Sequence, residues 1–194
     1  MNLKEMKPVK MNPKQVIGQA MGQVMGQAIG IVTAFGILAA LAAPARADNV
    51  LTTHRLGAEL AAEAVSEAVA TCAKQGYKVT AAVVDSDGVT QALLRGDGAT
   101  MTALDAAPDK AYTLLMLGAP RGEENNTAVV QRLGATPSAG GLAKLPHVLL
   151  APGAVVIKAG GEAIAAIGVG GAPGGNLDEA CAKAGADKIG DRLK

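Results

Sequence analysis

Aromatic side chains are almost missing from this chain of 194 residues, which has no tryptophan, one phenylalanine and two tyrosines. Proteins usually hold nucleic acids through basic charge, and hold single strands by stacking the bases on aromatic rings. This chain has neither feature, since its formal charge is only +1. We therefore expect no nucleic-acid partner. The composition also predicts a core of small aliphatic side chains, which each bury little area, so contact between copies of the chain would add stability.

Histidine and cysteine are also scarce, with only His54, His147, Cys72 and Cys181. Covalent haem attachment is excluded because there is no Cys-x-x-Cys-His motif. No second ligand stands at zinc spacing from either cysteine, and no serine lies in a Gly-x-Ser-x-Gly elbow. The cysteines can form a disulfide in an oxidising compartment if their Cα atoms lie within about 7 Å. They can equally be two small buried residues, and the sequence leaves both options open.

The first 47 residues have the pattern of a secretory signal peptide. Lysines come first, residues 29–43 are almost wholly apolar, and Ala45-Arg46-Ala47 has small residues where a signal peptidase reads them. This pattern predicts cleavage after Ala47. The apolar run is shorter than the roughly 20 residues of a membrane span. Two alternatives stay open: translation that starts at Met11 or Met21, and retention of the segment as an anchor.

Cleavage would leave a single domain of residues 48–194 in the periplasm or outside the cell, with no membrane attachment. Residues 1–47 hold five cationic side chains and one acidic one, so their removal changes the formal charge from +1 to −3. We expect a mildly acidic, exported protein of one-domain size.

The mature part alternates between helical and strand patterns. Turn residues at 85–88 and 159–161 predict two hairpins, and hairpins with grouped helices favour a largely antiparallel α+β fold. Thr52 and Thr53 are the expected caps of the first helix. Pro108 predicts a kink in the second helix, or its start. The expected helices are 54–75, 102–117, 121–133 and 177–192, and the expected strands are 79–84, 89–95, 147–150, 154–158 and 162–169.

A glycine-rich loop at residues 170–175 separates the last strand from the last helix. Asn176 is the expected cap of this helix, with Asp178 and Glu179 in its first turn. A strand that runs through glycines into a helix N-terminus brings free backbone N–H groups to one point, which can hold a carboxylate or a phosphate. The other interpretation is a close connection with no ligand.

Four motifs follow one another along residues 51–189. They are the hairpin Val83-Val-Asp-Ser-Asp-Gly-Val89 with Arg95 after it, the helix Leu104-Asp-Ala-Ala…Lys110-Ala-Tyr-Thr113, the turn Pro152-Gly153, and Ile167-Gly-Val-Gly-Gly-Ala-Pro-Gly174 leading into Asp178-Glu-Ala-Cys-Ala-Lys-Ala-Gly185. Together and in this order they resemble the GlcG/HbpS-like family (DUF336). Several members bind haem, and a related domain occurs in some corrinoid adenosyltransferases. The resemblance implies a profilin-like fold, a five-stranded antiparallel sheet with helices on both faces, and assembly into multimers.

The chain departs from the family's pattern at two places. Pro108 and Asp109 stand where many members have two arginines, which leaves Lys110 as the cation of that segment. Thr102 stands where many members have a histidine before Leu-Asp. If that histidine ligates haem in those members, the role falls here to Thr102, to the thioether of Met101, or to neither. Met101 can also be core filler.

The resemblance, with the glycine loop, predicts a haem or tetrapyrrole site and no catalytic or metal site. His147 is added because it follows Pro146 at a loop boundary where it can reach a cavity, although it can also be an ordinary half-buried histidine. The predicted cofactor-binding residues are Thr102, Met101, Lys110, His147, Gly171, Gly174 and Gly175.

The sequence therefore favours an exported, non-enzymatic, homo-oligomeric protein that holds haem or another tetrapyrrole at a subunit boundary. One alternative is an accessory subunit of a periplasmic redox enzyme, which would have a redox partner. Another is a haem-degrading enzyme, against which stands the lack of a convincing acid–base pair.

Overall fold

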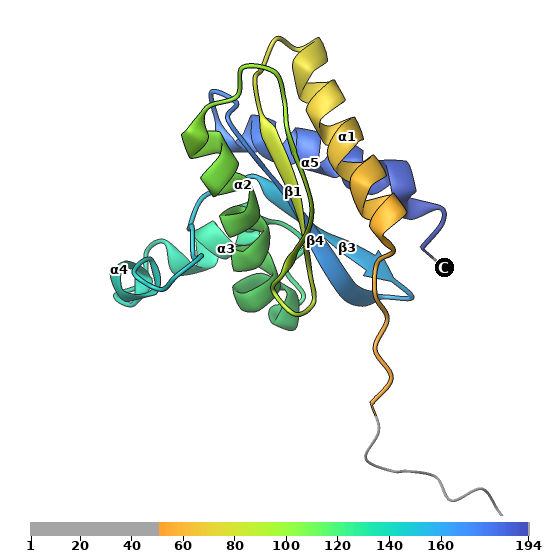
Figure 1. The fold of residues 1–194 in the computed structure, drawn as a ribbon. Coiled ribbons are helices and arrows are strands. Elements are labelled where there is room, and N and C mark those ends of the chain that lie inside the picture. Colours follow the sequence, from red (N-terminus) through yellow and green to blue (C-terminus); the bar gives the residue numbers. More distant parts are fainter. Residues whose placement is uncertain (1–50, 194) are drawn as a thin grey trace, which may run out of the picture. The chain divides into compact units, whose positions relative to one another are not determined.

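The computed structural model describes residues 51–193, so the predicted signal peptide lies outside the described residues. No helix in the described part is long and apolar enough to cross a membrane. The elements, shown in Figure 1, are α1 (Ala58–Lys74), β1 (Thr80–Asp85), β2 (Thr90–Arg95), α2 (Met101–Thr113), the π-helix η1 (Leu114–Gly118), the 3₁₀ helix η2 (Ala119–Arg121), α3 (Asn126–Leu133), α4 (Ala139–Leu142), β3 (Ala154–Ala159), β4 (Glu162–Gly170) and α5 (Gly175–Gly190).

The strands form one antiparallel sheet in the order β2-β1-β4-β3, which confirms the predicted α+β class and both hairpins. The sheet has four strands, so the prediction of five was wrong. The expected strand at 147–150 does not form. His147 has a left-handed backbone with φ 63°, and the N–H of Leu149 donates to the Thr113 hydroxyl at 2.8 Å. This segment bonds to a helix side chain instead of to a sheet edge.

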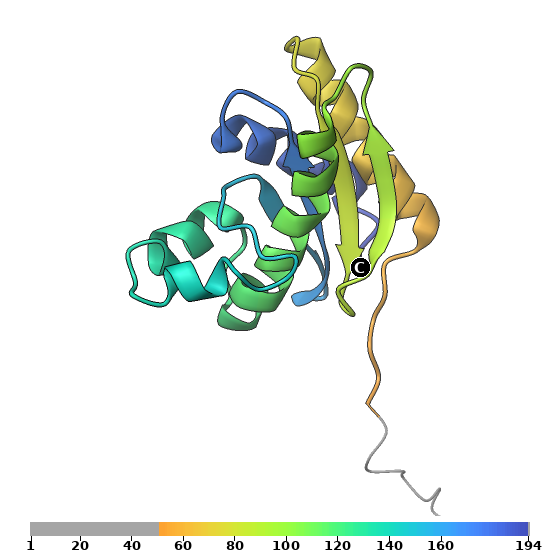
Figure 2. The same ribbon diagram turned by 60° about the vertical axis from the view of Figure 1, so that its left-hand side comes forward.

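Helices cover both faces of the sheet, as Figures 1 and 2 show: α1 and α5 pack on one face, and α2 with η1 on the other. Ala81 and Val83 of β1 point into the α1–α5 core, and Val84 points into the α2–η1 core. The alternation follows from the period of two in a strand. Gly168 lets α2 approach closely, because a Cβ there would lie 2.1 Å from the Ala107 carbonyl oxygen.

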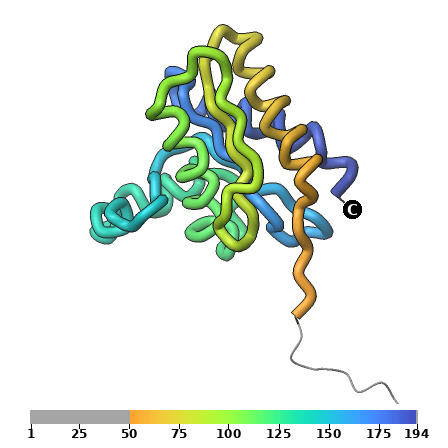
Figure 3. Tube along the Cα trace, in the orientation of Figure 1, coloured from red at the N-terminus to blue at the C-terminus, as the bar shows by residue number. Residues whose placement is uncertain are grey.

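The first two helices do not begin where the sequence predicted. The first starts at Ala58 with Gly57 as its N-cap, so the predicted caps Thr52 and Thr53 were wrong. Residues 51–57 are extended and pass the hairpin turn, which can be followed in Figure 3; there Arg55 pairs with Asp87 at 2.5 Å. The α2 helix runs through Pro108, so the alternative in which it begins there was also wrong.

The remaining helix starts and caps also differ from the expectation. Thr100 caps α2 by accepting from the Ala103 N–H at 3.2 Å. The third helix begins at Asn126, five residues later than expected, because the Asn125 side chain caps it by accepting from the Ala128 N–H. The last helix begins at Gly175 with Gly174 as its N-cap, so Asn176 is not the cap.

A disulfide joins Cys72 on α1 to Cys181 on α5, with the Cα atoms 5.7 Å apart. This resolves the question that the sequence left open. Both cysteines are fully buried in the α1–α5 core, so the bond ties together the two helices of one face.

Candidate functional site

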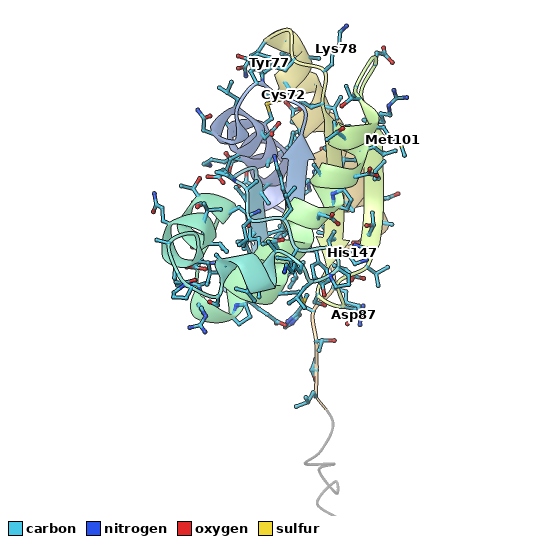
Figure 4. The ribbon with its side chains drawn as sticks, turned by 90° about the vertical axis from the view of Figure 1, so that its left-hand side faces the viewer. Cys72, Tyr77, Lys78, Asp87, Met101 and His147 are labelled. Carbon is cyan, nitrogen blue, oxygen red and sulfur yellow. A yellow bond between two sulfur atoms is a disulfide. The ribbon has the colours of Figure 1, made fainter. Side chains whose placement is uncertain are left out.

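The first turn of α2 presents its side chains to solvent. Met101, the first residue of the helix, is 67% exposed, and Thr102 is exposed beside it. Figure 4 shows Met101 projecting outward near one end of the domain. The turn contains no acidic residue, so the partial positive charge of the helix N-terminus is not compensated within it. The interpretation of Met101 as core filler is therefore wrong.

The exposed face of β2 continues this surface. Leu93 and Arg95 pair with Ala82 and Thr80 of β1, which in turn pair with Gly168 and Gly170, the glycines that contact α2. Paired residues of neighbouring strands point to the same side of a sheet, so both side chains lie on the α2 face.

The α2 helix packs mainly over β1 and β4, which leaves this part of β2 open. Leu93 is 42% exposed, and the Arg95 guanidinium donates to the Ala99 carbonyl at the entrance to α2. We call Leu93, Arg95, Met101 and Thr102 the α2–β2 surface. It combines apolar area, one cation, a thioether and a hydroxyl. The sequence alone did not indicate that Leu93 and Arg95 contribute to this surface, because strand alternation does not show which face a helix leaves uncovered.

Lys110 does not reach this surface. Its ammonium group is buried and donates to Asp178 Oδ2 at 2.7 Å and to the Val169 carbonyl at 3.0 Å. Asp178 is buried too, and its Oδ1 accepts from the Ala172 N–H at 2.9 Å. The pair thus links the last turn of α2 to the first turn of α5 and to the glycine loop.

Burial raises the pKa of Asp178, while the hydrogen bond and charge of Lys110 and the Ala172 N–H oppose this rise. Desolvation penalises the charged carboxylate, whereas a close cation favours it. Because Lys110 is held by two acceptors inside the protein, its role in the structure is to position the loop.

The glycine loop meets α2 at its first residues. At Gly171, whose φ is +121°, a Cβ would lie 3.1 Å from Ala103 Cβ and 2.6 Å from the Lys78 carbonyl oxygen. Gly174 and Gly175 lie further along, at the start of α5, where a Cβ on Gly175 would meet Pro152. The anion that faces this loop is the protein's own Asp178 carboxylate. Gly171 therefore packs against the first turn of α2 at Ala103, and Gly174 and Gly175 belong to the loop's packing.

Glu179, the other acidic residue in this part of α5, is also held by hydrogen bonds within the protein. Its carboxylate accepts from the Thr127 N–H and hydroxyl and from the Gly153 N–H, at distances of 2.9 to 3.2 Å. It therefore joins α5 to the start of α3 and to the turn before β3.

His147 lies apart from the other predicted residues, beside the hairpin turn that carries Asp87 (Figure 4). Its Nδ1 is 3.2 Å from Asp109 Oδ1, and its ring packs edge-on against Tyr112 at 5.7 Å between centroids. These side chains line a small hollow of about 100 Å³. Asp109 lies seven residues after Thr102, or roughly 10 Å along α2. The structure thus places Met101 and Thr102 side by side at the start of α2, with Gly171 against the neighbouring Ala103, and leaves His147 elsewhere.

The part of the chain that the structure describes contains no group of three or more histidine, cysteine, aspartate or glutamate side chains placed to hold a metal ion. A metal held by the porphyrin nitrogens of haem needs only one or two axial ligands from the protein. Of the predicted side chains, Met101 and Thr102 are exposed at the α2–β2 surface, and His147 is exposed at its separate hollow.

Comparison with known proteins places these features in a family. A family model described as "Haem degrading protein HbpS-like" matches residues 56–187. A crystal structure of HbpS is 36% identical with a TM-score of 0.67, and covers 75% of this chain and 98% of its own. A double mutant of HbpS from Streptomyces reticuli is 34% identical with a TM-score of 0.67, and covers 84% of this chain and 99% of its own.

A more distant structure shares the fold. The crystal structure of a PduOC:heme complex is 19% identical with a TM-score of 0.59, and covers 70% of this chain and 96% of its own. A search of curated protein sequences finds no match.

Proposed function

The chain belongs to the HbpS-like family, and from this premise we propose that it is an exported haem- or tetrapyrrole-binding protein that works without catalysis as a homo-oligomer. The relationship to haem rests on the family's description and on HbpS, which is more than 30% identical over most of this chain. The PduOC:heme complex has a similar fold with a bound haem.

The observation that carries the proposal is the α2–β2 surface. A tetrapyrrole has a broad apolar plane and negatively charged propionates. Leu93 and Met101 offer apolar area, while Arg95 and the helix N-terminus favour negative charge. Met101 Sδ and Thr102 Oγ1 are the side-chain donors that can reach an iron at this surface. In this arrangement Lys110 is a positioning residue, since it holds the adjoining loop through Asp178.

Export is supported by the predicted signal peptide and by the buried disulfide. Disulfides form and persist mainly in oxidising compartments such as the periplasm and the extracellular space. A protein in the periplasm or outside the cell can bind haem before the haem enters the cytoplasm.

A hemin titration of the processed protein tests the proposal. We expect a Soret band to grow with added hemin, and Met101→Ala or Thr102→Ala to shift or weaken it. Arg95→Gln should weaken binding roughly tenfold, because one charged hydrogen bond is lost. Leu145→Ala, which truncates another exposed apolar side chain, is the matched control and should bind like the parent. An unchanged hemin spectrum throughout the titration of the parent protein would refute the proposal.

The family's description favours haem degradation as a second candidate. It predicts that hemin and a reductant yield an opened tetrapyrrole and released iron. The two candidates separate cleanly, because a binding protein returns intact hemin after the same treatment.

A further inference from the structure

A second hollow lies away from the α2–β2 surface, between the η1–η2 segment and α3 with α4. Its volume is about 440 Å³, within the range of roughly 300–1,000 Å³ found for small-molecule sites. Five of the seven lining residues are apolar and the other two are Arg121 and Arg132. We call this hollow the η1 groove.

An unusual backbone forms one wall of the η1 groove. Leu114–Gly118 is a π-helix that continues α2, and Met116 and Leu117 line the groove from it. Such segments are rare in proteins and frequently occur at functional sites. Gly118 presses this wall against α3, because a Cβ there would lie 2.6 Å from Val129 Cγ2. The groove is thus held by packing between elements.

The two arginines of the groove differ in their partners. Arg132 is fixed by Glu123, with Nε and Nη2 donating to the two carboxylate oxygens at 2.6 and 2.7 Å, and by the Leu117 carbonyl at 2.8 Å. Arg121 is exposed and makes no salt bridge with residues 51–193. The single carboxylate of Glu123 therefore neutralises only one of the two guanidinium groups. The groove keeps an excess of positive charge.

Met116 gives the groove room to adapt. It is 36% exposed and, with Pro120, also lines a neighbouring hollow of about 220 Å³. Its side chain is unbranched and flexible, and methionine suits binding surfaces that fit more than one shape. An apolar body can lie along Met116, Leu133 and Leu142 while an anionic end reaches Arg121.

We propose that the η1 groove is a second ligand site, which binds a small amphipathic carboxylate with its anionic end on Arg121 and its apolar body along the groove. The site is separate from the α2–β2 surface. Met116 is fifteen residues after Met101 on continuous helix, which places the two roughly 20 Å apart. The proposal goes beyond the proposed function and does not depend on haem.

The experiment uses the fluorescent probe 8-anilinonaphthalene-1-sulfonate on the processed protein, with octanoate and octylammonium as competitors. We expect octanoate to displace the probe and octylammonium, its opposite in charge, to leave it bound. Arg121→Gln should weaken the probe and octanoate roughly ten- to hundredfold, as loss of a charged hydrogen bond implies. Arg121→Lys should retain part of the affinity because it keeps the charge but not the planar fork.

Two further variants sharpen the test. Leu142→Asp places a carboxylate in the wall and should also weaken the probe, and Arg192→Gln removes an arginine at the end of α5 as the matched control. Hemin binding should be unchanged in all four variants. Equal probe affinity in the parent and Arg121→Gln, or displacement by octylammonium as effective as by octanoate, would overturn the proposal. Parallel loss of hemin binding in Arg121→Gln would overturn the separateness of the site.

Discussion

At the scale of single residues, Lys110 is the side chain whose surroundings differ most from the sequence-based expectation. It was predicted to bind the cofactor, and the structure buries it in an ion pair with Asp178, which also takes the Ala172 N–H. Removal of either charge of a buried ion pair is strongly destabilising, because the other charge stays buried without a partner. The pair therefore makes the position of the glycine loop depend on α2.

We predict that Lys110→Met lowers the free energy of unfolding by about 3–5 kcal/mol, because Asp178 is left as an uncompensated buried charge. The double variant Lys110→Met/Asp178→Asn should lose less, since it has no buried charge and the new amide oxygen can still accept from the Ala172 N–H. Urea unfolding of the parent, both single variants and the double variant gives the coupling energy. Additive losses would contradict the interaction.

At the scale of elements, α1 and α5 depend on each other for one face of the sheet. Their contact is made of small side chains, and a Cβ on Gly185 of α5 would lie 2.4 Å from the Ala64 carbonyl oxygen of α1. Small residues allow this close approach but each buries little apolar area. The Cys72–Cys181 bond adds stability to this contact, because it links positions 109 residues apart and so constrains the unfolded chain.

We predict that Cys72→Ala/Cys181→Ala, or reduction of the parent, lowers the free energy of unfolding by about 2–5 kcal/mol, because the unfolded chain is no longer constrained. Urea unfolding with and without reductant measures this. The alanine variant should not respond to reductant, which separates the disulfide from other effects of the reagent. Equal midpoints for the oxidised and reduced parent would show that the bond does not stabilise the fold.

At the scale of the whole molecule, the sheet ends in β2, an edge strand with exposed apolar side chains. Leu93 and Leu94 are 42% and 37% exposed, and Val89 in the preceding turn is 59% exposed. Soluble proteins usually protect such edges with charge or cover them. Covering by a second copy would bury this strand and place the α2–β2 surface, which shares Leu93 with it, at a subunit boundary, where the sequence predicts the tetrapyrrole site.

We predict that the processed protein is a homo-oligomer and that Leu94→Lys weakens its assembly, because a charge on the edge strand opposes pairing. Light scattering after size-exclusion chromatography gives the mass at each concentration. Leu145→Lys, which adds the same charge at an exposed leucine of another loop, is the control and should keep the parent's mass. A monomer at all concentrations of the parent would contradict this prediction.

The sequence by itself determined the local elements. Turn residues at 85–88 between two short runs with strand composition specify the first hairpin, and the helical spacing in 58–74 specifies α1, since these signals come from neighbours along the chain. It also identified the haem-related family and predicted Met101 and Thr102 beside the start of the second helix, while their exposure came from the structure.

Only the tertiary structure decided which distant groups meet. The ion pair of Lys110 with Asp178 spans 68 residues and the disulfide spans 109, and neither has a signal in local spacing. Likewise, the apolar run at 147–150 satisfies its backbone on Thr113 and not on a strand, and the open part of β2 exists because α2 packs over β1 and β4. Local propensity sets the elements, but burial and hydrogen bonding between elements choose their partners.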